Sequence, residues 1–328
     1  TLWHTLSLHD ALPISDEHAF LDSRYKEITV KKDMFRYIEP RASSKTMAFI
    51  DGGNAEIFST PDLSVYMIRV AASIFRNRKQ VKKVIHDCYC TIEIKEEKVF
   101  YTFQPISGSF FKGNGSYLKI EKTTTSTDDN SCIDMIRRIS EIRFAEHITD
   151  EVEENSIIVL DGTLRTESDE ENRNMKNLLN SCMEKNILLS SIAKTNRIIT
   201  KKGENFLRII SEKSPKHEWS FKIETNDMTK TYMVKLNKRS DFIFRLEMME
   251  EQKTADERKV LGMLALNSMD PVIIGYPYGL ICADKAARVT NEETSYMKTK
   301  LETRLKSPKK LLYSINSTSF HERLDSIS

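Results

Sequence analysis

Two short apolar runs in this sequence each end in an aspartate that is followed by glycine. The first run, at 47–50, precedes Asp51, and the second, at 157–160, precedes Asp161. A short apolar run bounded by a turn residue predicts a buried strand, so each carboxylate is expected at the tip of a strand. The glycine that follows lets backbone or ligand come close to the carboxylate. Two such tips in one sheet can hold a divalent cation between them.

Asp-Gly is also among the commonest turn dipeptides, so either aspartate alone is as well explained by a turn as by a site. The presence of two, both closing hydrophobic strands, favours a site. Mg²⁺ and Mn²⁺ prefer carboxylate oxygens and few protein ligands, with waters and substrate phosphates completing the octahedron. Paired ions about 4 Å apart can activate a water and stabilise the leaving oxygen in phosphodiester cleavage.

A third carboxylate is expected from a helix over 131–149 that faces the strand tips. Glu141 and Glu146 both lie on it, and because its apolar surface is broad, helical periodicity does not choose between them. The ordinary alternative for Glu141 is an i,i+4 ion pair with Arg137 on a solvated face.

Two more charged residues are candidates. Lys194 follows a third predicted strand, where it could neutralise a metal-bound phosphate or position the water. From the residues alone an ordinary exposed lysine is the favoured interpretation. Asp284 lies on a helix entered through the aromatic, proline and glycine loop 275–279, and its alternative is an i,i+4 pair with Arg288.

The composition bounds the class of protein. The chain has 328 residues, 30% of them charged, and its net charge is +2, so nucleic-acid contacts must come from local basic patches. No apolar run approaches the roughly 20 residues that a membrane helix needs. The five cysteines are odd in number and scattered, which indicates reduced thiols in a cytoplasmic protein and no zinc site.

The order of elements predicts the fold. Residues 1–15 lack a helical or strand period, resemble translated sequencing-adapter read-through, and are expected to be a non-native leader. Residues 16–44 are expected to form a helical lead-in, and residues 45–325 one domain with an insertion at about 77–130. Strands first, then strand–helix alternation, predict an α/β fold: a ribonuclease-H-like mixed sheet with flanking helices and an inserted subdomain. No glycine-rich nucleotide-binding motif is present.

Individual elements are predicted from periodicity and capping signals. Strands are expected at 45–51, 55–59, 63–75, 156–161, 187–192, 219–223, 232–236 and 242–247. Helices are expected at 131–149, 168–185, 201–210, 253–269 and 290–305.

Taken together, an ordered set of motifs resembles the NurA nuclease family over about residues 45–325. Each motif is weak alone, but the set is fairly specific. The motifs are Asp51-Gly52-Gly53, Arg137-Arg138-x-x-Glu141, Leu160-Asp161-Gly162-Thr163-Leu164, Ile192-Ala193-Lys194, Val234-Lys235-Leu236, Phe244-Arg245-Leu246-Glu247, Gly275-Tyr276-Pro277-Tyr278 with Ala283-Asp284, and Phe320-His321-Glu322-Arg323-Leu324-Asp325.

The resemblance implies a Mn²⁺- or Mg²⁺-dependent DNA nuclease that forms a ring-like homodimer. It also implies a partner, the HerA hexameric translocase, in the resection of DNA ends during repair. By position, Asp51, Glu141 and Asp161 would be metal ligands. Asp284 falls where some members place a histidine, and an ionised aspartate there can bind a hard ion but cannot donate a proton. Tyr276 would line the DNA path or hold its loop.

Basic residues after the third predicted strand, Arg197, Lys201 and Lys202, are expected to guide the DNA strand through phosphate contacts with little base specificity. Two other classes compete with this interpretation. One is a catalytically inactive DNA clamp or motor-docking module. The other is an actin-like phosphotransferase, which ranks last because it would need more glycine-rich loops than the chain's 10 glycines provide.

Overall fold

The computed structural model describes residues 17–60, 63–95, 98–107, 119–123, 129–194, 198–225, 229–250 and 254–304. The expected leader at 1–15, Arg197 and the motif at 320–325 lie outside the described residues.

Most strands join one large sheet. Its members are β3 (Arg36–Tyr37), β4 (Thr46–Ser59), β5 (Leu63–Arg76), β6 (Lys79–Lys95), β7 (Lys98–Ser107), β8 (Lys119–Thr123), β9 (Ile157–Asp161), β10 (Leu188–Ala193), β11 (Trp219–Ile223), β12 (Thr229–Lys235) and β13 (Phe244–Met249). The spatial order is β3-β11-β12-β13-β10-β9-β4-β5-β6-β7-β8. A separate small sheet pairs β1 (Glu17–His18) with β2 (Ile28–Thr29).

The centre of the sheet has the predicted ribonuclease-H-like topology. Strands β4, β5 and β6 form antiparallel neighbours, whereas β9 pairs parallel to β4 and β10 pairs parallel to β9. The parallel connections run through α1 (Asp129–Ile148) and α2 (Asp169–Glu184). Beyond β10, the antiparallel strands β13, β12 and β11 continue the same sheet.

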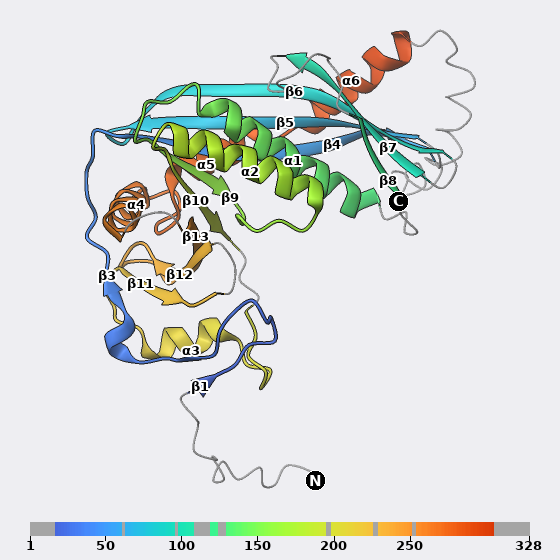
Figure 1. Cartoon of the computed structure of the whole chain (residues 1–328). Coiled ribbons are helices and arrows are strands. Elements are labelled where there is room, and N and C mark those ends of the chain that lie inside the picture. The colour runs from blue at the N-terminus through green and yellow to red at the C-terminus, as the bar shows by residue number, and fades with distance from the viewer. Residues whose placement is uncertain are drawn as a thin grey trace, which may run out of the picture.

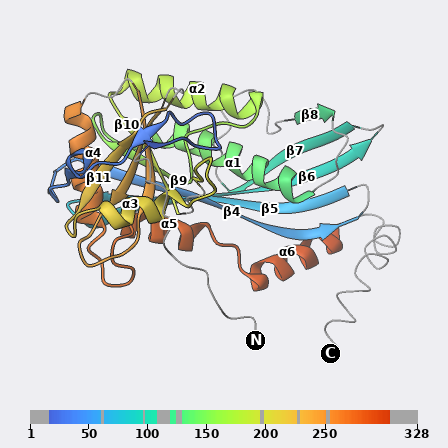
Figure 2. The same ribbon diagram turned by 90° about the horizontal axis from the view of Figure 1, so that it is seen from below.

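Helices cover both faces of the sheet, as the two views in Figures 1 and 2 show. Because side chains alternate along a strand, Ala48 and Ile50 of β4 pack on the α1 and α2 side, and Met47 and Phe49 pack on the opposite side. That opposite side is covered by α4 (Thr254–Asn267) and α5 (Tyr278–Ala287). The two faces of β4 therefore belong to two different hydrophobic clusters.

Two further helices lie away from the centre. The helix α6 (Asn291–Arg304) contributes to a cluster with the outer parts of β4, β5 and β6, and α3 (Phe206–Lys213) packs near β11 and the N-terminal segment. In Figure 1, α3 and β1 lie at the opposite end of the molecule from the long strands β4 to β7. No helix within the described ranges is long and apolar enough to cross a membrane.

Capping residues fix several helix starts as predicted. Ser168 accepts a hydrogen bond from the Glu171 backbone N–H at the start of α2. At the start of α6, the Thr290 hydroxyl accepts from the Glu293 N–H, while the Glu293 carboxylate accepts from the Thr290 N–H. These reciprocal bonds form a capping box. Cys88, Cys90, Cys182 and Cys282 are free thiols.

The prediction of a helical lead-in at 16–44 is wrong. The described part of this segment contains β1, β2, a short 3-10 helix at Lys32–Met34 and β3, and no α-helix. Its apolar residues Phe20, Tyr25, Ile28 and Val30 pack against α3 and β11 in one cluster. Tertiary packing and pairing of β3 with β11 thus outweigh local helical preference.

Other differences concern the extent of elements. The two strands predicted at 45–51 and 55–59 are one continuous strand, β4, paired with β5 throughout except for an irregularity near 56–58. The helix expected at 201–210 begins at Phe206, where the Asn205 side chain caps it. Residues expected as an insertion, 77–130, supply β6, β7 and β8, which extend the main sheet.

Candidate metal centre

Asp51 lies inside β4, at the point where the neighbouring strand β9 ends. The parallel pairing of the two strands stops at Ile50 and Leu160, and β4 then continues to Ser59 against β5 alone. The expectation that Asp51 marks the tip of its own strand is therefore wrong. The tip belongs to β9, whose last residue is Asp161, and its ending exposes the flank of β4.

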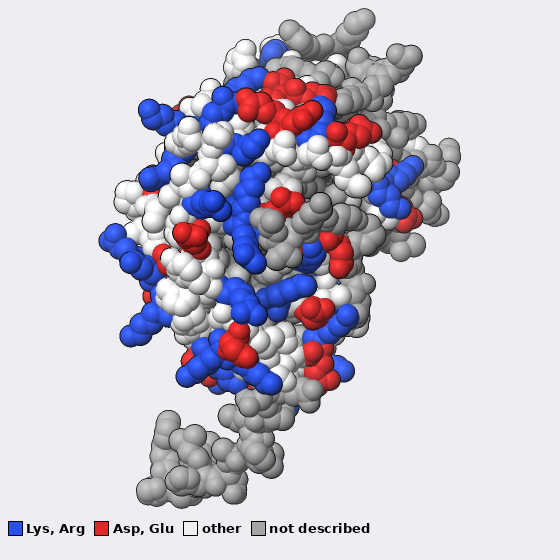
Figure 3. Space-filling model, turned by 60° about the vertical axis from the view of Figure 1, so that its left-hand side comes forward, with Lys and Arg blue, Asp and Glu red and all other residues white. Residues whose placement is uncertain are grey.

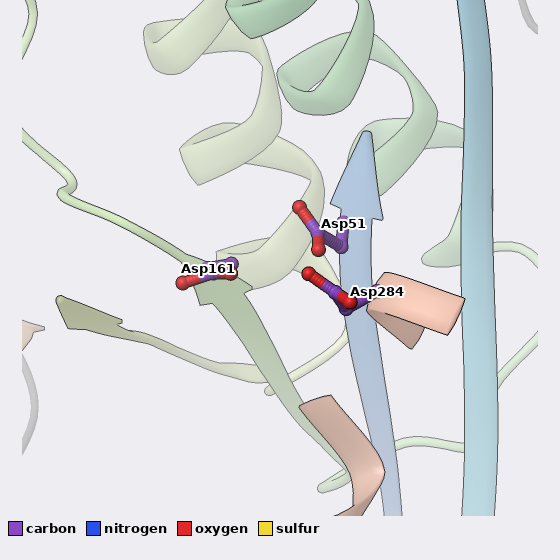
Figure 4. A group of neighbouring side chains, drawn as sticks. All are labelled: Asp51, Asp161 and Asp284. Carbon is purple, nitrogen blue, oxygen red and sulfur yellow. The ribbon is translucent and has the colours of Figure 1, made fainter. Parts of the chain in front are cut away.

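A third aspartate joins these two from α5. One carboxylate oxygen from each of Asp51, Asp161 and Asp284 lies within 4.8 Å of the others. Figure 4 shows the three side chains converging from β4, β9 and α5 on one space. Asp51 shares the face of β4 occupied by Met47 and Phe49, which is the face that α5 covers. Three hard oxygen donors at this separation match the preference of Mg²⁺ or Mn²⁺.

Glu141 reaches the same region from the other face of the sheet. It lies on α1, only 3% exposed, and packs on Gly52 so closely that a Cβ atom there would lie 2.8 Å from its Oε1 atom. Arg137 and Arg138 hold its carboxylate at 2.5 and 3.3 Å. The alternative of an Arg137 ion pair is thus observed, on a buried carboxylate rather than a solvated face. Glu141 adjoins the three aspartates without belonging to the group that could share one ion.

Burial and crowding of like charges perturb the acids. Burial, followed by the charges of Asp161 and Glu141, raises the pKa of Asp51 to about 8. The Asp51 carboxylate also accepts a hydrogen bond from the Gly52 N–H at 2.8 Å, which opposes the shift. Burial likewise raises the pKa of Glu141, although Arg137 and Arg138 act in the opposite direction. An added cation would relieve this repulsion.

Lys194 follows β10 and contacts the aspartate group directly. Its Nζ atom lies 2.6 Å from Asp161 and 3.4 Å from Asp284. Burial alone would lower the pKa of Lys194, but the ion pair with Asp161 and the charges of Asp51 and Asp284 raise it. The lysine is therefore held as a cation at the centre: its side chain is exposed, as in the alternative, and it is paired with Asp161 and Asp284.

Tyr276 packs behind this lysine. The Lys194 Nζ atom lies 5.6 Å from the centre of the Tyr276 ring, and the ring is 5.2 Å from that of Phe244. Only 5% of Tyr276 is exposed, and burial together with the charges of Asp161 and Asp51 raises the pKa of its hydroxyl. This burial suits a residue that holds its loop in place better than one that offers a ring face to DNA.

The remaining predicted residues lie elsewhere. Lys201 and Lys202 are exposed on a turn next to the N-terminal segment, where the Lys201 N–H donates to the Ala19 carbonyl at 2.7 Å. The predicted alternative for Asp284, an i,i+4 pair with Arg288, is present at 3.3 Å, so Asp284 contacts both Arg288 and Lys194.

No role was predicted for a group of residues that hold the segment after Asp161 in place. Glu247 on β13 is fully buried and accepts hydrogen bonds from the Thr163 hydroxyl at 2.6 Å and the Leu164 N–H at 2.7 Å. Arg138 donates to the Thr163 carbonyl as well as to Glu141. Alternation along β13 sets Arg245 and Glu247 on one face, but nothing in the sequence reveals that this face is buried.

Comparisons with known proteins agree with this geometry. The chain matches the NurA domain family over residues 45–289. No curated protein matches it. A crystal structure of NurA aligns with a TM-score of 0.53 at 10% identity, covering 83% of this chain and 91% of that one. A crystal structure of NurA bound to dAMP and manganese aligns with a TM-score of 0.57 at 9% identity, covering 85% and 92%.

At such low identity the two solved structures establish a shared fold, whereas the family match spans about three quarters of the sequence from Lys45 to Val289. On that match, this chain belongs to the NurA family of nucleases.

Proposed function

We propose that this chain is a Mn²⁺- or Mg²⁺-dependent nuclease that hydrolyses DNA phosphodiester bonds. The observation that carries the proposal is the convergence of Asp51, Asp161 and Asp284 within 4.8 Å. The NurA structure that contains dAMP and manganese supports the same choice of ion and substrate class.

In this proposal Asp51, Asp161 and Asp284 hold the ion, and Glu141 adds negative charge from beneath Gly52. Bound Mn²⁺ or Mg²⁺ would polarise the phosphate and lower the pKa of an attacking water. Lys194, already paired with Asp161, would then face the phosphate and offset part of its charge. Tyr276 would keep Lys194 in position through its ring.

The setting of this reaction follows from family membership. We infer a ring-like homodimer that acts with a HerA-type hexameric translocase on DNA ends in cytoplasmic repair. A linear strand threaded through a ring needs an end, and the translocase would deliver it. Exonuclease action with little base specificity is therefore expected. An inactive clamp remains the competing function, and intact carboxylates at positions 51, 141 and 161 argue against it.

The test is a nuclease assay on linear DNA with Mn²⁺, comparing the wild type with Asp51→Asn and Asp161→Asn. Each variant should cleave at least about 100-fold more slowly than the wild type. Loss of a residue that only supports a metal ligand typically costs about 10- to 100-fold. Glu212→Gln, at an exposed ion pair on α3, is the matched control and should keep its rate. Equal rates in all four proteins would overturn the proposed site, and no cleavage by any of them would favour the clamp.

A further inference from the structure

A basic pocket lies at the start of β4, on the N-terminal side of Asp51. It has a volume of about 300 Å³ and lies between the segment before β4, the turn that joins β5 to β6, and the end of α4. Its rim carries three cationic side chains, Arg41, Lys45 and Arg78. Its floor is apolar and includes Met47 and Phe75.

The charge of this pocket is not balanced by acids. None of the residues that line it is acidic. In the described part of the chain, no hydrogen bond or ion pair engages the side chains of Arg41, Lys45 or Arg78. Basic residues nearby behave differently: Arg76 pairs with Glu153, and Lys82 pairs with Glu151. The pocket thus concentrates positive charge on a protein whose net charge is only +2.

Two independent features point to the same excess of charge. Burial and the nearby Lys45 ammonium both lower the pKa of Lys259 on α4. The side of the molecule that carries α4 in Figure 1 turns toward the viewer in Figure 3, where Lys and Arg form a band down the face. Asp and Glu gather mainly at the upper end of that view.

The turn at the rim has an unusual backbone. Asn77 and Arg78 both have left-handed φ angles, +49° and +65°. A two-residue hairpin turn requires this conformation, which glycine or asparagine adopts more readily than arginine. The chain therefore keeps a cationic side chain at the rim in a position where a smaller residue would suit the turn better.

The pocket and the aspartates lie on the same side of the sheet. Met47 in the pocket floor and Asp51 are four residues apart on the same face of β4, a separation of about 13 Å. The helix α5 spans the same interval: the Tyr278 ring at its start lies 6.1 Å from that of Phe75, and the Ala287 carbonyl at its end adjoins Gly53. Lys285 is exposed on this helix.

We propose that this pocket binds a backbone phosphate of the DNA strand whose cleavage occurs at the aspartates. In a duplex, where each nucleotide of a strand advances about 3.4 Å along the helix axis, a separation of about 13 Å corresponds to roughly four nucleotides. The inference rests on the proposed function, because a DNA strand must occupy this face for the pocket to meet it. An acidic protein segment would also suit three cations, but it would have no reason to lie in line with the aspartates.

The test is binding by fluorescence anisotropy in EDTA, with labelled single-stranded oligonucleotides of 4 and 12 nucleotides at several salt concentrations. The wild type should bind the longer oligonucleotide more tightly. The triple variant Arg41→Gln/Lys45→Gln/Arg78→Gln should lose at least about tenfold in affinity for it. Its slope of log affinity against log salt should fall by about 0.7, the contribution of one single-strand phosphate contact.

A matched control removes three positive charges elsewhere, Lys26→Gln/Arg208→Gln/Lys222→Gln, each in an exposed ion pair near α3 and β11. It should retain wild-type affinity, and thermal unfolding should show that both triple variants are folded. Unchanged binding of the 12-nucleotide strand by the pocket variant would overturn the proposal. So would a pocket variant that loses affinity for polyglutamate, as a mimic of an acidic protein segment, while it keeps its affinity for the 12-nucleotide strand.

This measurement separates the two proposals. Binding in EDTA does not depend on cleavage, so a chain that binds as expected but never cuts would refute the nuclease and leave the pocket intact. Cleavage that depends on Asp161, together with unchanged DNA binding by the pocket variant, would refute the pocket and leave the nuclease intact.

Discussion

At the scale of single residues, the aspartate group is poised for a cation because its members repel one another. Asp51 has its pKa raised to about 8, first by burial and then by Asp161 and Glu141, so in the absence of metal it holds a proton at neutral pH. A divalent ion must expel that proton to gain the third carboxylate. Metal affinity and pH are therefore coupled at this site.

This coupling predicts a pH dependence. The folded pKa of Asp51 lies above its usual value of 3.8, so without metal the stability contributed by its proton is lost as pH rises from about 4 to about 8. In EDTA, Asp51→Asn should unfold at a higher temperature than the wild type. The difference in unfolding free energy should widen over this range to at most about 6 kcal/mol, since one pKa unit is worth about 1.36 kcal/mol.

The same linkage applies to the ion. Mn²⁺ binding by the wild type should strengthen with pH up to about 8 and release close to one proton at pH 7, as titration calorimetry in buffers of different ionisation enthalpy would measure. Glu212→Gln should reproduce the wild-type curve. A binding constant that is flat between pH 6 and 8 would contradict the coupling.

Gly52 is a second residue on which the site depends. A Cβ atom there would meet the Glu141 side chain at 2.8 Å, and Glu141 cannot move freely because two arginines hold it. Gly52→Ala should cost about 1–3 kcal/mol of unfolding free energy. It should also reduce cleavage at least about tenfold by displacing Glu141.

A double-variant cycle isolates this contact. Shortening the acid with Glu141→Asp should make room for the methyl group, so Gly52→Ala should cost less in that background when measured by urea unfolding. If the losses of unfolding free energy in the two single variants simply add in the double variant, the strain does not come from the contact between Gly52 and Glu141.

At the scale of elements, the segment after β9 is fixed by a residue from β13. Glu247 contacts the Arg245 and Arg165 guanidinium groups at 3.0 and 3.5 Å while bonding to Thr163 and Leu164. Because Asp161 immediately precedes this segment, β13 helps to set the position of its carboxylate.

Removing the buried acid should be costly. Glu247→Ala should destabilise the protein by about 3–5 kcal/mol, since it leaves buried arginines without a counter-charge. The exposed Glu250→Ala, just beyond β13, should change the unfolding free energy by less than about 0.5 kcal/mol. Equal urea midpoints for the two variants would show that Glu247 is not a support.

At the scale of the whole molecule, a sheet with eleven strands in the described residues carries the site near its middle and extends in both directions. The strands β5 to β8 lengthen one side, and β13 to β11 with β3 extend the other (Figure 1). The aspartates therefore lie near the middle of the sheet and not at either edge.

A homodimer is the assembly expected of this family. Sedimentation equilibrium should give twice the mass of one chain at micromolar concentration, with and without DNA. A monomer that cuts linear DNA as fast at nanomolar as at micromolar concentration would contradict a ring that encloses its substrate.

Local pattern predicted many of the elements in the nuclease domain. The strand at 219–223 matches β11, and the capping signals at Ser168 and Thr290 give the starts of α2 and α6. The prediction of a helical N-terminal segment is wrong because its apolar residues, among them Phe20 and Tyr25, are buried by distant partners, α3 and β11. Local preference is weak where contacts far along the chain determine the conformation.

The order of strands and helices along the chain was enough to predict the central sheet topology, and carboxylate chemistry was enough to predict the residue types able to bind a hard cation. Which carboxylates meet depends on tertiary packing. Asp284 joins Asp51 and Asp161 because α5 lies on the face to which Asp51 points, whereas Glu141 arrives through the opposite face at Gly52. Side-chain alternation gives each strand two faces, and packing alone selects the helix that covers each of them.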